Sequence, residues 1–171
     1  PLLNRALRGT YPPGSTYKPF MAMAALQLGT RSPTTIINDP GFYMFGGHRF
    51  GSPENERGGA MDMNRAIVES SNAYFYSLAN EMGVDAMHDF MKPLGFGQIT
   101  GIDIFGEVRG VLPSQDWKRN YYKRPEQQKW YAGETISLGI GQGYNSFTML
   151  QLAQATATLV NNGIKHKPQL V

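Results

Sequence analysis

Hydrophobic residues cover every side of the segment 20–28, which contains a single polar residue. A segment with this pattern is expected to form a helix that is buried on all sides. The residues at 12–14 disfavour a helix before Ser15, and Pro19 lacks the N–H that an interior position needs, so it fits only a first turn. The pattern therefore predicts a central helix that begins at Ser15 and ends at Gly29.

A helical period returns after residue 61 and again near the C-terminus. It predicts three helices between residues 61 and 92, of which Gly83 stops the second and Pro93 the third. A last helix is predicted with Ser146 or Thr148 as its cap. Its predicted apolar face consists of Leu152, Ala153, Thr156, Leu159 and Val160.

The segments between these helices are rich in turn-forming residues. Residues 29–60 are predicted to form a loop that contains a hairpin of strands 42–45 and 48–50. Residues 95–113 predict a turn-rich connection.

Two further segments predict strands. Residues 135–143 predict a strand-like approach to a glycine cluster, and residues 167–171 predict the start of a strand. Together with the helices they predict a mixed α and β fold that is mostly helical, without an internal domain boundary.

Composition limits the classes of protein that this chain can represent. Its 171 residues, of which 41% are hydrophobic and 17% charged, are typical of one globular domain. A formal net charge of +3 is too weak to argue for nucleic acid. The absence of cysteine excludes disulfides and thiolate metal sites. No apolar run approaches the ~18 residues of a membrane span. Because the first residue is proline, we expect an excised piece, and any anchor or targeting signal would lie upstream.

Two groups of residues carry weaker signals. Asp39, His48 and Asp62 are metal-ligand types, but their spacing matches no metal motif, so solvated or hydrogen-bonded roles are favoured. Residues 117–131 interleave basic and aromatic side chains, a pattern that can bind single-stranded nucleic acid. Acidic residues dilute this charge, and an ordinary amphipathic surface segment is favoured.

Candidate chemistry begins with Ser15 and Lys18, three positions apart at the start of the central helix. Residues at this spacing share a face, with Cβ atoms roughly 5–6 Å apart. A serine hydroxyl becomes a nucleophile when a base removes its proton, and burial near a helix N-terminus favours the neutral lysine amine. The Ser15 N–H is placed to face a developing oxyanion. Serine and lysine at this spacing recur by chance, so the pair alone is a weak signal.

A second polar group, Glu69-Ser70-Ser71-Asn72, lies between two predicted helices. Ser71 or Asn72 would serve as an ordinary N-cap. In the functional interpretation, the turn faces Ser15: Ser70 relays a proton, and the Asn72 amide binds a substrate carbonyl and steadies Lys18.

Several motifs occur in a fixed order along the chain. They are Asn4-Arg5-Ala6, Tyr11-Pro12-Pro13-Gly14-Ser15-Thr16-Tyr17-Lys18-Pro19, Ser70-Ser71-Asn72, Gly95-Phe96-Gly97, Thr100-Gly101-Ile102-Asp103 and Gly139-Ile140-Gly141-Gln142-Gly143. With them the chain resembles the transpeptidase domain of class B penicillin-binding proteins, most closely the elongation-type enzymes. The resemblance covers nearly all 171 residues.

The resemblance implies a penicillin-binding protein or serine β-lactamase-like fold and a peptidoglycan D,D-transpeptidase activity. Ser15 would attack the penultimate D-Ala of a stem peptide, with Lys18 and Ser70 as further catalytic residues, and β-lactams would acylate the same serine. Asn72 and the segment Gly141-Gln142-Gly143 would bind substrate. No cofactor or metal is implied.

The resemblance also implies partners and a location. The implied partners are stem peptides, β-lactam antibiotics and other cell-wall elongation proteins, and nucleic acid is not among them. The implied location is the periplasmic face of the bacterial inner membrane.

One motif of this family is absent. No lysine after Lys18 is followed by Thr-Gly or Ser-Gly, the pattern that marks the strand on the far side of the family's cleft. We therefore expect residues 1–171 to be a partial transpeptidase domain, truncated at both ends and inactive when isolated.

Two other classes of protein stay open. One is a serine β-lactamase or D,D-carboxypeptidase, which needs a general base for deacylation, such as Glu107 or Glu134. The other is a penicillin-binding sensor or scaffold that is acylated without turnover.

Overall fold

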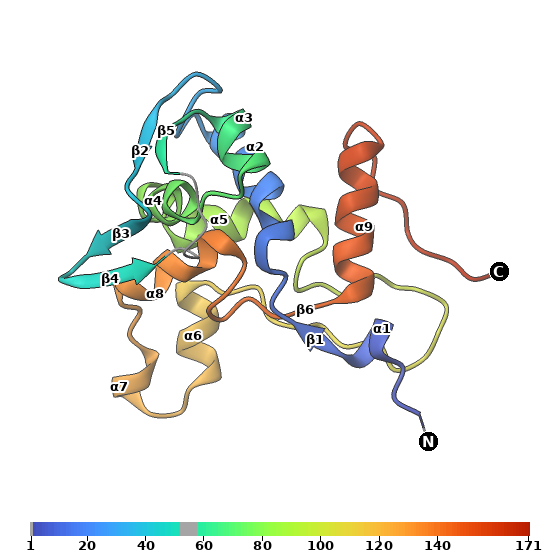
Figure 1. Ribbon diagram of the computed structural model, residues 1–171. Coiled ribbons are helices and arrows are strands. Elements are labelled where there is room, and N and C mark those ends of the chain that lie inside the picture. The colour runs from blue at the N-terminus through green and yellow to red at the C-terminus, as the bar shows by residue number, and fades with distance from the viewer. Residues whose placement is uncertain (1, 52–57) are drawn as a thin grey trace.

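Two helices form the centre of the molecule, α2 (Lys18–Leu28) and α4 (Asn72–Met82). The structure is a computed structural model that describes residues 2–51 and 58–171. Figure 1 shows the other elements arranged around these two helices. The largest fully buried hydrophobic side chains of the pair are Phe20, Met21, Tyr74, Phe75 and Leu78. The core therefore lies between two segments that the apolar pattern predicts as helices.

Helix α2 confirms the predicted central helix and corrects its burial. A 3₁₀ turn, Gly14–Tyr17, leads into it, with Pro19 in the first turn. Gly29 ends it in a left-handed conformation. Leu26 and Leu28 are 47% and 48% exposed, so only the first two turns are buried on all sides.

The three helices predicted after residue 61 are present. They are α3 (Met63–Val68), α4 and α5 (Val84–Met91), and a 3₁₀ turn, Lys92–Leu94, follows α5. Gly83 separates α4 from α5 with a φ of +82°, which a glycine adopts without strain. The N-terminal approach contains a short helix, α1 (Arg5–Arg8).

The segment predicted as a loop contains more strand than expected. The predicted hairpin is confirmed as β3 (Phe42–Phe45) and β4 (His48–Gly51). A second antiparallel pair, β2 (Ile37–Asp39) with β5 (Gly59–Met61), contradicts the loop prediction. Strands of three residues are too short to show alternation, and this pairing joins positions about twenty residues apart. Only the folded chain brings the two strands together.

Between α5 and the next helices, residues 95–113 form the predicted turn-rich connection, with one bridge from Val111 to Ser146. Helices α6 (Gln115–Tyr121) and α7 (Pro125–Gln128) then form a helical hairpin. Figure 1 shows this hairpin projecting at the lower left of the molecule. We call residues 115–131 the α6–α7 arm.

Residues 132–140 are helical, which contradicts the predicted strand-like approach at 135–143. They form α8 (Ala132–Ile136) and a 3₁₀ turn, Ser137–Ile140. Gly139 lies so close to α4 that an added Cβ would be 2.2 Å from the Phe75 carbonyl oxygen. Packing against α4 therefore outweighs the strand preference of the β-branched residues in this segment.

The last helix, α9 (Met149–Val160), is capped by Thr148, as predicted. Its buried residues are Gln151, Ala155 and Thr158. The predicted apolar face is therefore wrong, since Ala153, Thr156 and Val160 are exposed and Leu152 and Leu159 are only partly buried. The buried face carries Gln151 because its amide donates to the Gln98 and Arg109 carbonyls, so a polar residue takes a core position.

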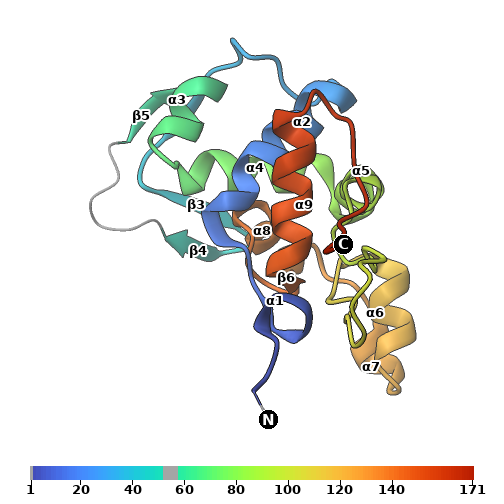
Figure 2. The same cartoon turned by 90° about the vertical axis from the view of Figure 1, so that its right-hand side faces the viewer.

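The two ends of the chain also differ from the prediction. Strand β1 (Thr10–Tyr11) pairs with β6 (Phe147–Thr148), a pairing without a signal in the sequence. Residues 164–171 form no regular element, so the predicted strand at 167–171 is wrong. They run beside α9, as Figure 2 shows, and the Leu170 N–H donates to Asp103. Within residues 2–51 and 58–171, no helix has the length and apolar character needed to cross a membrane.

Candidate active site

Ser15 lies at the surface on the 3₁₀ turn that precedes α2, while the residues after it turn inward. Tyr17 is 2% exposed, and its ring packs against Phe96 and Phe147 at centroid distances of 5.3 and 5.8 Å. Burial raises the pKa of the Tyr17 hydroxyl well above its ordinary value, so Tyr17 stays protonated at neutral pH. Its role is to anchor the turn that exposes Ser15.

The Lys18 amine is buried below Ser15 and meets three oxygens of the turn between α3 and α4. Lys18 is 2% exposed. Its Nζ lies 2.6 Å from the Ser70 carbonyl oxygen, 2.9 Å from the Ser70 hydroxyl and 2.7 Å from the Asn72 Oδ1. These contacts fix the amine against the Ser70 turn.

Ser70 connects the two turns. Its Oγ donates to the Ser15 Oγ at 3.1 Å, and the same Oγ accepts from the Lys18 amine. Its φ of +56° is uncommon for a non-glycine residue, and such strained positions cluster at functional sites. The structure thus brings together Ser15, Lys18, Ser70 and Asn72, while their catalytic and binding roles remain predictions.

Ser71, the middle residue of this turn, is the N-cap of α4. Its hydroxyl accepts from the Tyr74 N–H at 3.1 Å and donates to Asp39 Oδ2 at 2.5 Å. Asp39 is 2% exposed, and its Oδ1 also accepts from the Gly41 N–H. A buried carboxylate of β2 therefore holds the turn that carries Ser70 and Asn72. Sequence reasoning missed this support, although the Asp-Pro-Gly turn around Asp39 was a local signal for a hydrogen-bonded aspartate.

The other two residues of metal-ligand type serve structural roles. Asp62 caps α3 by accepting from the Arg65 N–H at 2.8 Å. His48 is exposed on the hairpin, with its ring 4.7 Å from that of Phe50. Within the described part of the chain, no three His, Asp or Glu side chains form a group that could hold a metal ion.

The glycine cluster lies against the Ser15 turn. The Gly14 N–H donates to the Gly141 carbonyl oxygen at 3.0 Å. Gly141 has a φ of +72°, and an added Cβ would be 2.3 Å from the Gly14 carbonyl oxygen. Gln142 and Gly143 are exposed next to it. Gly141 is therefore a packing surface for the turn, and contact of the three residues with substrate remains a prediction.

A salt bridge ties the α6–α7 arm to α8, which precedes the glycine cluster. Lys118 Nζ lies 2.6 and 2.8 Å from the two carboxylate oxygens of Glu134. Glu134 also accepts from the Tyr131 N–H and the Tyr144 hydroxyl. Partial burial would raise the pKa of Glu134, but the bonds from Lys118, Tyr131 and Tyr144 outweigh it and hold that pKa below its ordinary value. Glu134, Ser137, Gly143 and Tyr144 line a cavity of about 240 Å³.

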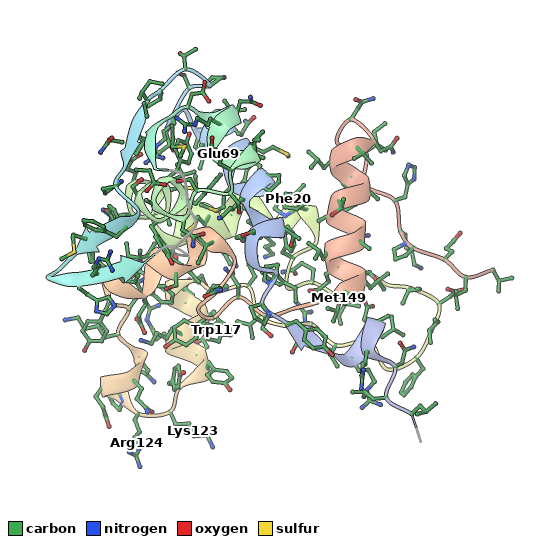
Figure 3. The ribbon with its side chains drawn as sticks, viewed as in Figure 1. Phe20, Glu69, Trp117, Lys123, Arg124 and Met149 are labelled. Carbon is green, nitrogen blue, oxygen red and sulfur yellow. The ribbon has the colours of Figure 1, made fainter. Side chains whose placement is uncertain are left out.

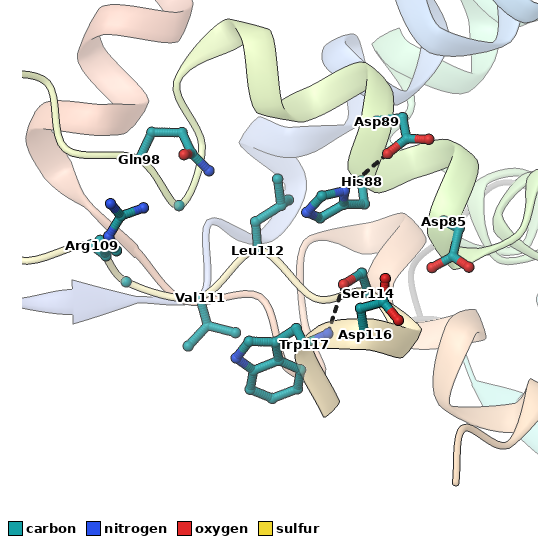
Figure 4. Close-up of a pocket in the computed structure, with 12 residues that line it drawn as sticks. Asp85, His88, Asp89, Gln98, Arg109, Val111, Leu112, Ser114, Asp116 and Trp117 are labelled. Carbon is teal, nitrogen blue, oxygen red and sulfur yellow. Dashed lines mark hydrogen bonds and ion pairs between the residues drawn. The ribbon is translucent and has the colours of Figure 1, made fainter. Parts of the chain in front are cut away.

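A larger cavity of about 500 Å³ lies between α5 and α6, and none of the four clustered residues lines it. Asp85, Asp89 and Asp116 are at one end of the group that lines it, and Arg109 is at the other, as Figure 4 shows. Asp85 already accepts from the backbone and side-chain amides of Gln115. This side of α6 is therefore acidic.

Known proteins match this chain over its whole length. The family model described as the penicillin-binding protein transpeptidase domain matches residues 1–171. The chain is 46% identical to the peptidoglycan D,D-transpeptidase MrdA of Haemophilus influenzae and 39% identical to that of Escherichia coli K12, covering all of this chain and 26% and 27% of those proteins. It therefore spans about a quarter of the length of these relatives.

Solved structures give the same result for the fold. The crystal structure of Pseudomonas aeruginosa penicillin-binding protein 2 in complex with WCK 5153 matches with a TM-score of 0.91 and 46% identity, over all of this chain and 38% of that one. The Helicobacter pylori penicillin-binding protein 2, in its complex with MreC, matches with a TM-score of 0.88 and 32% identity, over 99% and 31%. The predicted fold class is therefore confirmed.

Proposed function

The chain belongs to the penicillin-binding protein transpeptidase family, and on this premise we propose that it forms part of the acyl-transfer domain of a peptidoglycan D,D-transpeptidase. One observation carries the proposal. The exposed hydroxyl of Ser15 is linked through the Ser70 hydroxyl to the buried amine of Lys18, by contacts of 3.1 and 2.9 Å. This is a nucleophile joined to a base by a group that can pass a proton.

Acylation follows from that chain of contacts. The Ser15 oxygen attacks the carbonyl carbon of the penultimate D-Ala of a stem peptide, and its proton passes through Ser70 to the neutral Lys18 amine. The carbon–nitrogen bond to the terminal D-Ala then breaks, and the departing amine takes the proton back. A β-lactam presents an equivalent amide bond, so the same attack opens its ring and leaves Ser15 acylated.

The three oxygens around the Lys18 amine give this relay its direction. The Ser70 carbonyl and the Asn72 Oδ1 only accept hydrogen bonds, so they take the two hydrogens of a neutral amine. The Ser70 hydroxyl can also donate, so it is the neighbour that faces the amine lone pair. When Lys18 is charged, the same hydroxyl accepts from Lys18 and donates to Ser15. Rotation of two hydroxyl groups thus switches the chain between its two protonation states.

Asn72 has a second role in this proposal. Its Oδ1 accepts from Lys18, and in this proposal its amide N–H₂ group donates to a carbonyl oxygen of the substrate. The Asn72→Ala variant of the full-length protein is expected to lose about 1–3 kcal/mol of transition-state stabilisation, the value of a hydrogen bond left unmade in a buried site. The acylation rate constant measures this loss.

The second half of the reaction transfers the acyl group to an amine of a neighbouring stem and forms the cross-link. A hydrolase would instead need a base to activate water. Glu107 accepts from the Thr100 N–H and hydroxyl and from the Gly101 N–H, so it holds a loop. Glu134 is held by Lys118 and Tyr144. Because both glutamates already make these contacts, the transferase is favoured over a β-lactamase or carboxypeptidase that uses either glutamate as its base.

The proposed function also places the full-length protein in the cell. Peptidoglycan is assembled outside the cytoplasmic membrane, so we place this domain at the periplasmic face of the inner membrane. Among the solved relatives, one structure contains penicillin-binding protein 2 with MreC, and another is described as a peptidoglycan synthase complex. We propose partners of the same kind, cell-wall elongation proteins, for this chain.

Covalent labelling with fluorescent penicillin tests the proposal. The full-length protein is expected to be labelled once per chain, and Ser15→Ala is expected to lose the label, while Thr16→Ala serves as the matched control on the same turn. The protein is also incubated with lipid-linked peptidoglycan precursor, and the product is digested with lysozyme. Cross-linked stem peptides must appear in the digest, which separates a transpeptidase from a penicillin sensor. Rapid loss of the label by hydrolysis would contradict the transferase reading.

A further inference from the structure

The α6–α7 arm concentrates the net charge of the chain. Residues 115–131 hold five of the 16 basic residues and two of the 13 acidic ones, so the other 154 residues carry 11 of each. The formal net charge of +3 therefore resides entirely in one projecting hairpin. Lys118 is buried against Glu134, and the remaining arm cations, Arg119, Lys123, Arg124 and Lys129, are exposed.

The two cations at the tip of the arm point away from the body of the protein. Figure 3 shows Lys123 and Arg124 at the tip of the arm, with their side chains extending into solvent. Arg119 pairs with Asp116, but both side chains are well exposed, at 59% and 81%, and such pairs contribute little. The arm can therefore exchange this internal contact for an anionic ligand.

A cavity of about 420 Å³ lies on the arm beside these cations. It is lined by Gln115, Arg119, Pro125, Gln128, Lys129 and Trp130. Arg119 and Lys129 can bind a carboxylate, and the two glutamine oxygens can accept from hydroxyl or amide groups. The Trp130 indole offers an apolar face of fixed orientation, because its Nε1 donates to Thr135 Oγ1 at 2.9 Å. Cations, amides and an aromatic face together suit a sugar strand whose peptide stems carry carboxylates.

Aromatic rings extend this surface beyond the cavity. Tyr121 and Tyr131 are 64% and 52% exposed, and Tyr121 stacks on Trp117 with a centroid distance of 5.2 Å. Exposed rings beside cations can stack on the apolar faces of successive sugar rings. The opposite side of α6 is acidic, with Asp85, Asp89 and Asp116 around the larger cavity. An anionic chain is therefore directed to the α7 side of the arm.

We propose that the α6–α7 arm is a binding site for a carboxylate-bearing glycan strand, separate from the Ser15 cluster. A membrane surface fits less well, because the tip at 122–126 contains no aliphatic residue that could insert. A nucleic acid also fits less well, because Asp116 and Glu126 stand among the few cations. The inference rests on the proposed function, since peptidoglycan strands are the polymer of this chemistry that such an enzyme meets.

Hydrogen bonds and a salt bridge connect the arm to the residues next to Gly143. Lys118 donates to the Lys129 carbonyl and to Glu134, and Glu134 accepts from the Tyr144 hydroxyl next to Gly143. A strand held by the arm would thus have a fixed relation to the glycine cluster beside Ser15. Holding the polymer outside the cleft would raise the local concentration of its stems at the site.

The test measures binding of an uncross-linked glycan strand carrying tetrapeptide stems to the full-length protein. The arm variant Lys123→Gln/Arg124→Gln/Lys129→Gln removes three exposed charges, and the control variant Arg5→Gln/Lys92→Gln/Lys165→Gln removes three exposed charges elsewhere. Affinity is expected to fall about tenfold in the arm variant, the order expected for losing three exposed charge contacts. It is expected to stay within twofold in the control. Lys123→Arg/Lys129→Arg is expected to keep the affinity.

Three results would decide against the inference. Equal affinity of the arm and control variants overturns it, as does strand binding that is unchanged when the strand carboxylates are methylated. Loss of binding to phosphatidylglycerol vesicles with unchanged strand binding assigns the arm to a membrane surface instead. Penicillin labelling of the unsubstituted protein is measured in parallel, because a protein that binds the strand through the arm but takes no label contradicts the proposed function and leaves the arm site standing.

Discussion

Gly141→Ala is expected to slow acylation by displacing the turn that carries Ser15. At a φ of +72°, alanine costs about 1–2 kcal/mol more than glycine. The new Cβ would lie 2.3 Å from the Gly14 carbonyl oxygen and 2.8 Å from the Gly14 nitrogen. An ordinary contact is about 3.5 Å, so the Gly14 backbone must move by about 1 Å. The variant therefore disturbs the residue that precedes the nucleophile.

The size of the effect follows from this displacement. A misplacement of about 1 Å in a catalytic constellation costs about 10²-fold in rate. Overpacking adds about 1–3 kcal/mol to the strain of the left-handed backbone, so the free energy of unfolding should fall by about 2–5 kcal/mol. The acylation rate constant with fluorescent penicillin and thermal unfolding of the full-length protein measure the two effects separately.

Two neighbouring glycines provide controls. Gly133 lies in α8 with open space around its Cβ position, so Gly133→Ala should change neither acylation nor stability by much. Gly143 shares the positive φ, but the closest contact of its Cβ would be the end of the flexible Leu138 side chain, at 3.2 Å, and the next, Ser137 Cβ at 3.6 Å, is an ordinary one. Gly143→Ala thus reports the cost of the left-handed backbone alone, about 1–2 kcal/mol of stability. If Gly141→Ala is acylated as fast as Gly133→Ala, the contact between Gly141 and Gly14 does not position Ser15.

Three further predictions concern buried polar groups. Lys18→Ala should slow acylation by a factor of about 10² to 10⁴, the usual contribution of a positioned base, and stopped-flow labelling checks this. Asp39→Asn should weaken the bond to Ser71 and lower the acylation rate several-fold while the protein stays folded, as circular dichroism can verify. Glu134→Gln leaves the Lys118 charge buried without its counter-ion and should cost about 3 kcal/mol at pH 7. Because the folded-state pKa of Glu134 lies below 4.5, this contribution is complete above pH 4.5 and is lost as the pH falls through the folded-state value, so the melting temperatures of the two proteins should converge in acid.

Helices were the part of the fold that the sequence predicts well. Apolar spacing and the stops at Gly29 and Gly83 locate α2 and α4 within a few residues, because both signals act within one or two turns. The errors at residues 135–143 and on α9 share one cause. Gly139 and Gln151 are placed by contacts with distant backbone, the Phe75 carbonyl in one case and the Gln98 and Arg109 carbonyls in the other. Local propensity contains no information about such contacts.

In the site, too, the local contacts can be predicted from the sequence and the distant contacts cannot. Ser15 and Lys18 share a turn, and so do Ser70 and Asn72, so the chemistry can be read from spacing. Which turns face each other cannot be read from spacing alone, and here the family resemblance supplied the pairing. The residues that hold the two turns could not be predicted, because Asp39 and Gly141 look like ordinary turn residues in the sequence. Only the structure shows that they contact Ser71 and Gly14.

These two supports act on opposite sides of one contact, and this leads to a last prediction. Asp39 holds the turn that carries Ser70, and Gly141 holds the turn that carries Ser15. The turns meet at the 3.1 Å bond between the two serine hydroxyls. Displacing either turn weakens that bond, so the second displacement has less left to remove. The double variant Asp39→Asn/Gly141→Ala should therefore be acylated faster than the product of the two single effects predicts, whereas independent supports would give multiplicative losses. A fully multiplicative result would show that the two turns contribute to acylation through separate contacts and not through the Ser15–Ser70 bond.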